Sequence, residues 1–289
     1  MSHTFSFGGT GTQWEIEIFS HATLIQIEYL SHIVKQKVQE FERVYSRFRP
    51  DSFVNTSLMQ KGVVRLPSDA EKLFSLYKKL YTITNGLFTP LIGQVLVDAG
   101  YDAVYSLRPK KVHTPPAWED VAEYSFPNIL VHKSALYDFG AAGKGYLIDL
   151  VAQLIVEQGF SEFCVDAGRD IRLFSSKPVR VGLENPFNVE EAIGVATISK
   201  GSICASSGSR RTWDKYHHII NPRTLKSPRN IVATWVITDE ALLADALSTC
   251  LFLFPAIKLV PYFSFEYLIL FSDKTFVQSS SFPAEIFIK

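Results

Sequence analysis

Apolar residues recur along the chain with two spacings, one typical of strands and one typical of helices. Strand-like and helix-like segments do not alternate regularly, as they would in a chain that forms a parallel sheet. Residues 12–19 alternate polar and apolar side chains, as a half-buried strand does, whereas residues 24–45 carry apolar side chains at helical spacing. Residues 231–237 are β-branched and strand-like, and residues 260–289 alternate in strand fashion again. This arrangement predicts an α+β fold in which antiparallel β-sheets are flanked by helices.

Two further helices are predicted from apolar spacing together with capping residues. The first covers residues 69–84, with Ser68 as its N-cap and Glu71 completing a capping box. The second runs from about residue 239 to residue 254, with Thr238 as its N-cap. Both helices are amphipathic or largely apolar, so each is expected to pack against a sheet.

The length of the chain allows about two domains or one large domain. The chain has 289 residues, of which 47% are apolar and 20% are charged, and this is ordinary globular composition that excludes disorder as the main state. Residues 108–127 contain four prolines and few periodic apolar residues, which indicates a connecting loop. Of these two arrangements we expect the single domain, over residues 1–289, in which two lobes meet near residues 108–135.

The net charge and the N-terminal sequence limit the binding partners and the cellular compartment that we expect for this protein. Lys+Arg and Asp+Glu both number 29, which argues against a broad nucleic-acid surface. The most apolar stretch, residues 250–257, is far shorter than the roughly twenty residues of a transmembrane helix. Residues 1–18 resemble neither a signal peptide nor a lipidation segment, which predicts a cytoplasmic protein as written, or a membrane-associated extracytoplasmic one if a leader was removed. Three scattered cysteines indicate free buried thiols in a reducing compartment: Cys164, Cys204 and Cys250.

A glycine-rich turn at residues 140–145 precedes a predicted helix at residues 146–158. Glycine lets a backbone approach a ligand closely, a helix N-terminus favours anions, and Lys144 adds a full positive charge. The spacing is not that of a P-loop, because Gly145 rather than Ser or Thr follows the lysine. A ligand-binding turn and a merely tight turn of small residues are both compatible with this segment alone.

Asp245 and Thr249 are four residues apart on a predicted helix and therefore share one face. A carboxylate and a hydroxyl so placed offer two hard oxygen ligands to Mg²⁺. The surrounding leucines indicate that the helix is largely buried, and a buried carboxylate needs a partner. The alternative is a polar stripe on a half-exposed helix.

His217 and His218 are adjacent in a predicted strand, so at most one of them enters a given pocket. A histidine can act as a base near neutral pH, although this segment by itself favours a hydrogen-bonded structural role. Zinc-ligand spacing is absent around this pair. Residues 205–208 lack the G-x-S-x-G order of a serine hydrolase.

Taken together and in order, these segments resemble the ApbE family of FAD:protein FMN transferases from about Thr10 to Phe254. The early segment SRFRPDSFVNTSL (46–58) is similar to the family pattern S-x-[YF]-x-x-x-S-x-[LV], and TNGLFTPLIG (84–93) is similar to T-x-G-x-F-D-P. DFGAAGKGYLID (138–149) resembles D-L-G-G-[IV]-[AG]-K-G-Y-x-x-D. YHHIINPRT (216–224) and LADALST (243–249) resemble H-I-[IL]-D-P-x-T and A-D-A-L-x-T.

The resemblance implies a T-fold-like α+β architecture, binding of FAD and Mg²⁺, and transfer of FMN to a Thr or Ser hydroxyl of an acceptor flavoprotein with release of AMP. It implies that the metal is held by Asp245, Thr249 and the backbone carbonyl of Gly143, and that His218 is the base. The positions implied to contact FAD are Phe48, Leu87, Phe88, Thr89, Gly140, Lys144, Tyr146, His218 and Ile219.

The departures from the family patterns include five positions in turns and at the predicted site. The family residues Met, Asp, Gly, Asp and Gly are replaced here, in that order, by Thr10, Thr89, Arg169, Asn221 and Leu225. The implied metal ligands are all retained. Two alternatives to the transferase therefore stay open: an FAD pyrophosphatase that gives FMN and AMP, and a catalytically weak flavin-binding homologue.

Overall fold

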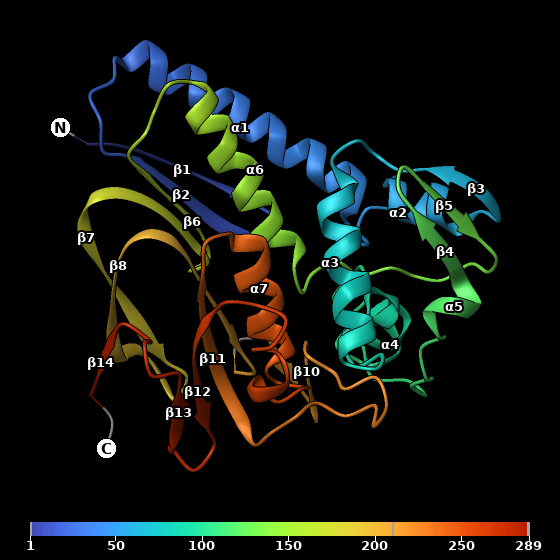
Figure 1. Ribbon diagram of the computed structural model, residues 1–289. Helices are drawn as coiled ribbons and strands as arrows, with labels where there is room; N and C mark the ends of the chain where they lie inside the picture. Colours follow the sequence, from blue (N-terminus) through green and yellow to red (C-terminus); the bar gives the residue numbers. More distant parts are fainter. Residues whose placement is uncertain (1, 210, 288–289) are drawn as a thin grey trace.

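A large antiparallel sheet organises the computed structural model, which describes residues 2–209 and 211–287 (Figure 1). Eight strands follow one another across the sheet in the order β1-β2-β6-β7-β8-β11-β12-β13, and β14 pairs with the outer part of β8. The strands are β1 (His3–Gly9), β2 (Thr12–Ile18), β6 (Phe163–Ala167), β7 (Ile171–Asn185), β8 (Asn188–Ser207), β11 (Ile231–Thr238), β12 (Glu266–Phe271), β13 (Phe276–Gln278) and β14 (Ala284–Ile286). The pairings within this sheet are antiparallel, which confirms the predicted α+β class.

Three helices cover one face of this sheet: α1 (Leu24–Tyr45), α6 (Gly143–Glu157) and α7 (Ala241–Cys250) (Figure 1). The alternation of β2 directs Trp14, Ile16 and Ile18 toward these helices, where all three are fully buried. Burial of each such side chain contributes roughly 1.5–3 kcal/mol. The principal core thus lies between the helical layer and the sheet.

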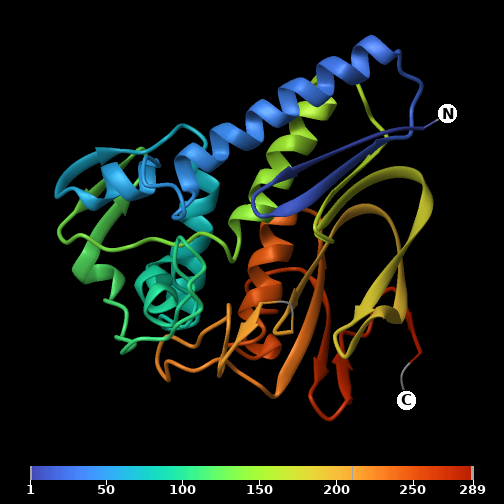
Figure 2. The same cartoon turned by 180° about the vertical axis from the view of Figure 1, so that it is seen from behind.

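A second, smaller core lies on the opposite face of the sheet. It forms where the outer halves of β7 and β8 curl over the strands beside them, after an irregularity between Phe174 and Val179. Leu173, Leu183 and Trp235 are among its buried members. The β7–β8 hairpin lies on the side of the molecule opposite α3 and α5 in both views (Figure 2).

The remaining elements form a lobe beside the main sheet. A three-stranded antiparallel sheet, in the order β3-β5-β4, is accompanied by short helices and by α3. The elements are α2 (Phe53–Thr56), η1 (Ser57–Met59), β3 (Gly62–Arg65), α3 (Ala70–Ile83), η2 (Pro90–Ile92), α4 (Gly93–Asp98), α5 (Trp118–Val121), β4 (Ala122–Ser125) and β5 (Asn128–Val131). A two-stranded ribbon and one further short helix come from the second half of the chain: β9 (Thr212–Trp213), β10 (Tyr216–His217) and η3 (Ala256–Lys258).

The predicted helix over residues 24–45 is confirmed to the residue, whereas two predicted caps are wrong. α3 begins after Asp69, which already has helical dihedrals, so the proposed Ser68–Glu71 capping box does not form. α7 begins after Glu240 rather than Thr238. The predicted connecting loop over residues 108–127 is also too long, because α5 and β4 occupy its final part.

Among the described helices, none combines the length and apolar character needed to cross a membrane. α1 is long enough but carries charged residues along its length.

Candidate functional site

A cavity of about 490 Å³ lies where the helical layer, the main sheet and the lobe meet. Eleven of the twelve site residues predicted from the sequence line it. These residues are Phe48, Leu87, Phe88, Thr89, Gly140, Gly143, Lys144, His218, Ile219, Asp245 and Thr249. Segments that are far apart in the chain are thus brought to one surface.

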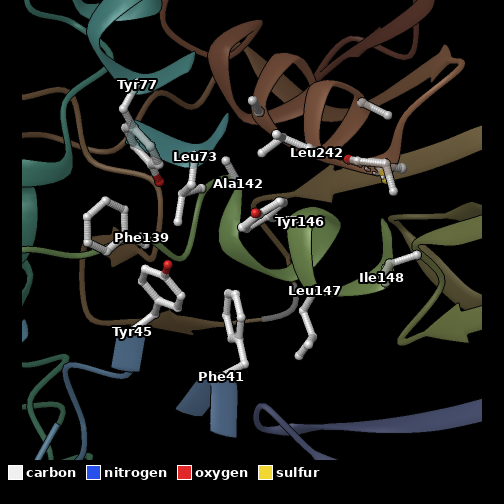
Figure 3. Close-up of a cluster of buried hydrophobic side chains, with 14 of the residues drawn as sticks. Phe41, Tyr45, Leu73, Tyr77, Phe139, Ala142, Tyr146, Leu147, Ile148 and Leu242 are labelled. Carbon is white, nitrogen blue, oxygen red and sulfur yellow. Dashed lines mark hydrogen bonds between the residues drawn. The ribbon is translucent and has the colours of Figure 1, made fainter. Parts of the chain in front are cut away.

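Tyr146 is the predicted site residue that does not line this cavity. Its ring lies in the buried cluster between α1 and α6, with its centroid 6.2 Å from that of Phe41 (Figure 3). Its hydroxyl donates a hydrogen bond to the carbonyl of Asp69. α6 begins at Gly143, earlier than the sequence predicts, and Tyr146 is buried beside Phe41, which itself lines the cavity.

One end of the cavity is built by the N-terminus of α6 and the middle of α7. The N–H of Gly145 donates to Asp245 Oδ2 at 2.8 Å. A Cβ on Gly145 would lie 2.6 Å from the Cβ of Asp245, so only glycine allows this approach of the two helices. Burial raises the pKa of Asp245, while the nearby Lys144 ammonium acts in the opposite direction. An ionised Asp245 at this position therefore depends on positive charge beside it.

The oxygen atoms at this end fit a small hard cation. Asp245, Thr249 and Gly143 line the same wall, and Thr249 Oγ1 lies 3.1 Å from Ser206 Oγ. Within residues 2–209 and 211–287, no cluster of three or more His, Cys, Asp or Glu side chains could hold a metal. A cation here would depend on one carboxylate, neutral oxygens and the oxygens of a ligand, which is the manner in which Mg²⁺ binds together with substrate phosphates.

Lys144 and the first turn of α6 bring a cation and backbone N–H groups to this end. Lys144 forms an ion pair with Asp170, which is buried and also accepts a hydrogen bond from the N–H of Ala205 at 2.9 Å. The positive end of the α6 dipole points at the same region. An anionic group such as a phosphate is therefore favoured here.

Another end of the cavity wall is aromatic. The guanidinium of Arg47 lies 4.1 Å from the centroid of Phe48 and 4.9 Å from that of Tyr101. Phe48 also stacks on Tyr105, with centroids 5.4 Å apart. The Arg47 side chain is only 3% exposed and forms an ion pair with Asp138. Flat rings and a planar cation offer stacking surfaces to an aromatic ligand.

The sequence did not indicate most of this aromatic end. Phe48 was predicted, but Arg47, Tyr101 and Tyr105 were not, because their approach is a tertiary contact between distant segments. Tyr101 accepts a hydrogen bond from Arg211 Nη1 at 2.8 Å, and burial raises the pKa of Tyr101 to about 12. It therefore stays a neutral phenol at physiological pH.

Only one of the two histidines lines the cavity, as predicted, although β10 ends at His217 and His218 lies outside the strand. His217 Nε2 lies 2.7 Å from the carbonyl of Pro228, and the N–H of Ile219 donates to His217 Nδ1. His217 is thus a neutral, hydrogen-bonded residue whose pKa is lowered by burial. His218 lines the cavity instead.

Two of the family departures lie in the cavity wall. Thr10 has a positive φ of 50°, and its N–H donates to Glu42 Oε1 at 2.7 Å. Thr89 accepts a hydrogen bond from the N–H of Leu91 at 3.1 Å and so caps η2. Both residues thus stabilise the local structure and also line the cavity.

The other three departures lie in turns. Asn221 Oδ1 accepts hydrogen bonds from the N–H groups of Arg223 and Thr224, as an aspartate would, so the turn is preserved. Arg169 and Leu225 stand where the family has glycine, at φ values of 76° and 55°. A non-glycine residue in this region costs on the order of 1–3 kcal/mol.

Comparisons with known proteins agree with this arrangement. A family model described as the ApbE family matches residues 10–264. A protein named FAD:protein FMN transferase from Rhodobacter capsulatus is 26% identical over 62% of this chain, although the match spans only 37% of that relative. A protein of the same name from Haemophilus influenzae is 25% identical over 91% of this chain and 82% of its own length.

Solved structures show the same fold. The flavin transferase ApbE from Vibrio cholerae superposes with a TM-score of 0.84, at 19% identity, over 98% of both chains. The ApbE protein from Thermotoga maritima gives a TM-score of 0.83, at 19% identity, over 99% of this chain and 100% of that one. Since the family model covers most of the sequence and the fold agrees throughout, this chain belongs to the ApbE family.

Proposed function

We propose that this chain is a Mg²⁺-dependent FAD:protein FMN transferase. It would attach FMN through a phosphoester to a Thr or Ser hydroxyl of an acceptor flavoprotein and release AMP. The observation that carries this proposal is a single cavity in which the aromatic group around Phe48 and Arg47 and the oxygen-rich group of Asp245 and Lys144 both line the wall. FAD combines a flat ring system with a diphosphate and matches both ends. Relatives that carry this activity in their names support the same proposal.

Each end of the cavity has a distinct part in the proposed reaction. The rings of Phe48 and Tyr105 would hold the isoalloxazine, while Lys144 and the N-terminus of α6 would bind the diphosphate. Asp245, Thr249 and the Gly143 carbonyl would hold Mg²⁺, which supplies neutralisation of phosphate charge when bound.

The proposed chemistry is an in-line displacement at the FMN phosphorus. The acceptor hydroxyl oxygen forms a bond to this phosphorus, the bond from phosphorus to the bridging oxygen breaks, and AMP leaves with the electron pair. His218, which lines the same cavity, would receive the proton of the hydroxyl.

Incubation with FAD and Mg²⁺ tests this proposal, with and without a flavoprotein domain that carries the target threonine. Mass spectrometry should find FMN on the acceptor and AMP in solution. An acceptor in which the threonine is replaced by valine, and a reaction with EDTA, are the controls. FMN and AMP without an acceptor would instead support the pyrophosphatase, and tight FAD binding without turnover would support a weak homologue.

A further inference from the structure

The outer half of β7 is an edge of the main sheet. In the part of the chain that the structure describes, β7 pairs with β6 only through residues 171–174, and with β8 on its other side. Residues 179–185 therefore have a partner strand on one side alone. Such an edge presents backbone N–H and C=O groups that another strand can pair with.

The hydrogen bonds of β8 establish which way its backbone groups point. The N–H of Thr197 donates to the carbonyl of Pro283 at 2.8 Å, and the carbonyl of Ile193 accepts from the N–H of Phe287 at 2.7 Å. Both bonds are directed toward the β14 side of β8. Because backbone groups alternate along a strand, the even-numbered residues here, 194 to 198, point toward β7.

The direction of the β8 backbone groups determines which N–H and C=O groups of β7 point away from the sheet. Ala196 of β8 lies opposite Val181. In an antiparallel pair, the backbone groups of two directly opposed residues either both point toward the partner strand or both point away from it. Because the groups of Ala196 point toward β7, those of Val181 point toward β8. Its neighbours Arg180 and Gly182 therefore direct their N–H and C=O groups away from the sheet, along the open edge.

A second cavity, of about 370 Å³, runs beside this edge. It is lined by the consecutive residues 179–184, and across from them by Cys164 and Asp166 of β6. A Cβ on Gly182 would meet nothing nearer than the Cβ of Ala192, at 4.0 Å, so the packing of this chain does not require glycine there. Glycine in a strand often marks a place where another backbone approaches closely.

This edge groove adjoins the reactive end of the main cavity. The two cavities share Gly168, Ala205, Ser206 and Ser207 in their walls. Ser206 Oγ lies 3.1 Å from Thr249 Oγ1, which is one of the proposed metal ligands. A chain lying in the groove would thus end at the phosphate-binding end of the site and not at the aromatic end.

The groove has no net preference for one sign of charge. Arg169 forms an ion pair with Glu184 across its mouth, and Asp166 and Arg180 add one charge of each sign. Its other lining residues are mostly apolar, including Trp235. These surroundings suit an extended segment recognised through its backbone and through small apolar side chains.

We propose that the acceptor protein docks here, by adding its hydroxyl-bearing segment as an extended strand along Arg180 and Gly182. Pairing at this edge directs the target Thr or Ser past Ser206 to the FMN phosphorus. This inference rests on the proposed transferase function. It assigns the edge groove to the acceptor and leaves the main cavity to FAD.

Proline at position 180 tests the pairing. Arg180→Pro removes the outward N–H and places a ring on the edge, while the bonds from Val181 to β8 remain. Arg180→Ala is the matched control, because it removes the charge and keeps the N–H. The acceptor is the threonine-bearing flavoprotein domain used to test the transferase, and FAD affinity is measured in parallel by flavin fluorescence.

The expected result is a KM for the acceptor that rises by about tenfold or more in Arg180→Pro, with FAD affinity unchanged. Arg180→Ala should raise this KM by no more than about twofold, in keeping with an exposed side chain. A wild-type KM in a folded Arg180→Pro protein overturns the docking site, as does an equal loss in both variants. If wild-type protein transfers no FMN, the proposed function fails first and the docking site fails with it.

Hydrogen exchange on the wild-type protein gives an independent answer if the proline variant does not fold. The protein is saturated with FAD and with an acceptor whose target threonine is replaced by valine. We expect slower amide exchange in residues 179–185 than with FAD alone. Unchanged exchange in this segment, with the acceptor demonstrably bound, overturns the proposal.

Discussion

The N–H of Gly145 donates a hydrogen bond to the carboxylate of Asp245 at 2.8 Å, and so joins the first turn of α6 to the middle of α7. The proposed metal ligands lie on both of these helices. Their relative position therefore depends in part on this contact, and substitutions at either residue can measure its effects on stability and on activity separately.

Asp245→Asn should abolish Mg²⁺-dependent turnover and leave the fold intact. The amide can still accept the hydrogen bond from Gly145 but supplies no charge to a cation. Asp245→Ala should also lose turnover and cost about 1–3 kcal/mol of unfolding free energy, because the Gly145 N–H loses its buried acceptor. Turnover as a function of Mg²⁺ concentration and denaturant unfolding measure the two effects. Normal Mg²⁺-dependent activity in folded Asp245→Asn would refute the metal site.

Gly143 and Gly145 should respond oppositely to alanine. A Cβ on Gly143 would lie 3.5 Å from the Cβ of Phe139, which is ordinary contact, and the ligand offered by this residue is its backbone carbonyl. Gly143→Ala should thus retain most activity. Gly145→Ala should destabilise the protein strongly, since its Cβ would overlap α7. Thermal unfolding and turnover of both variants check this, and an active, stable Gly145→Ala protein would contradict the helix contact.

His218→Ala should slow FMN transfer more than it weakens FAD binding, because a base acts on the attacking hydroxyl in the transition state. His217→Ala should mainly reduce stability, since His217 bonds to Pro228 and Ile219 away from the cavity. The measurements are kcat, the Kd for FAD and the unfolding midpoint of each variant. Turnover of His218→Ala at the wild-type rate would make His218 a binding residue only.

Asp149 should make stability depend on pH in mildly acidic solution. Burial raises the pKa of its carboxyl to about 6, although Arg172 opposes this effect, and Glu240 adds to it. A carboxyl with a raised pKa in the folded state binds its proton more readily when folded. Its contribution to the unfolding free energy therefore increases as the pH falls from above 6 toward 4, by at most about 3 kcal/mol.

Asp149→Asn is the matched variant for this prediction, since it keeps an acceptor for α7 and removes the titration. The difference in unfolding free energy between wild type and Asp149→Asn should change in favour of the wild type as the pH falls through this window. Urea unfolding at a series of pH values measures it. A difference that does not vary with pH would show that Asp149 titrates normally.

Sequence patterns predicted those parts of the fold that local periodicity determines. The helix over residues 24–45 has an unbroken apolar stripe and was predicted to the residue. The Asp245–Thr249 face was predicted because it needs only a helical spacing of four. The family resemblance likewise predicted eleven residues that line the cavity, about a third of its wall.

The remaining features depend on contacts between distant segments. Thr238 is a good N-cap residue by type, but the amides of Ala241 and Leu242 donate instead to the carboxylate of Asp149, at 2.9 and 2.8 Å. Nothing in the local sequence signals a cap supplied by another helix. The approach of Arg47 to Tyr101 is of the same kind, since it depends on how the lobe packs against α1.

The caps of α6 and α7 are reciprocal: Asp149 of α6 binds the first amides of α7, and Asp245 of α7 binds an early amide of α6. Neither helix can slide along the other or rotate without breaking both sets of bonds at once. The wall that they form is therefore rigid, and its oxygen atoms are in place before any ligand arrives.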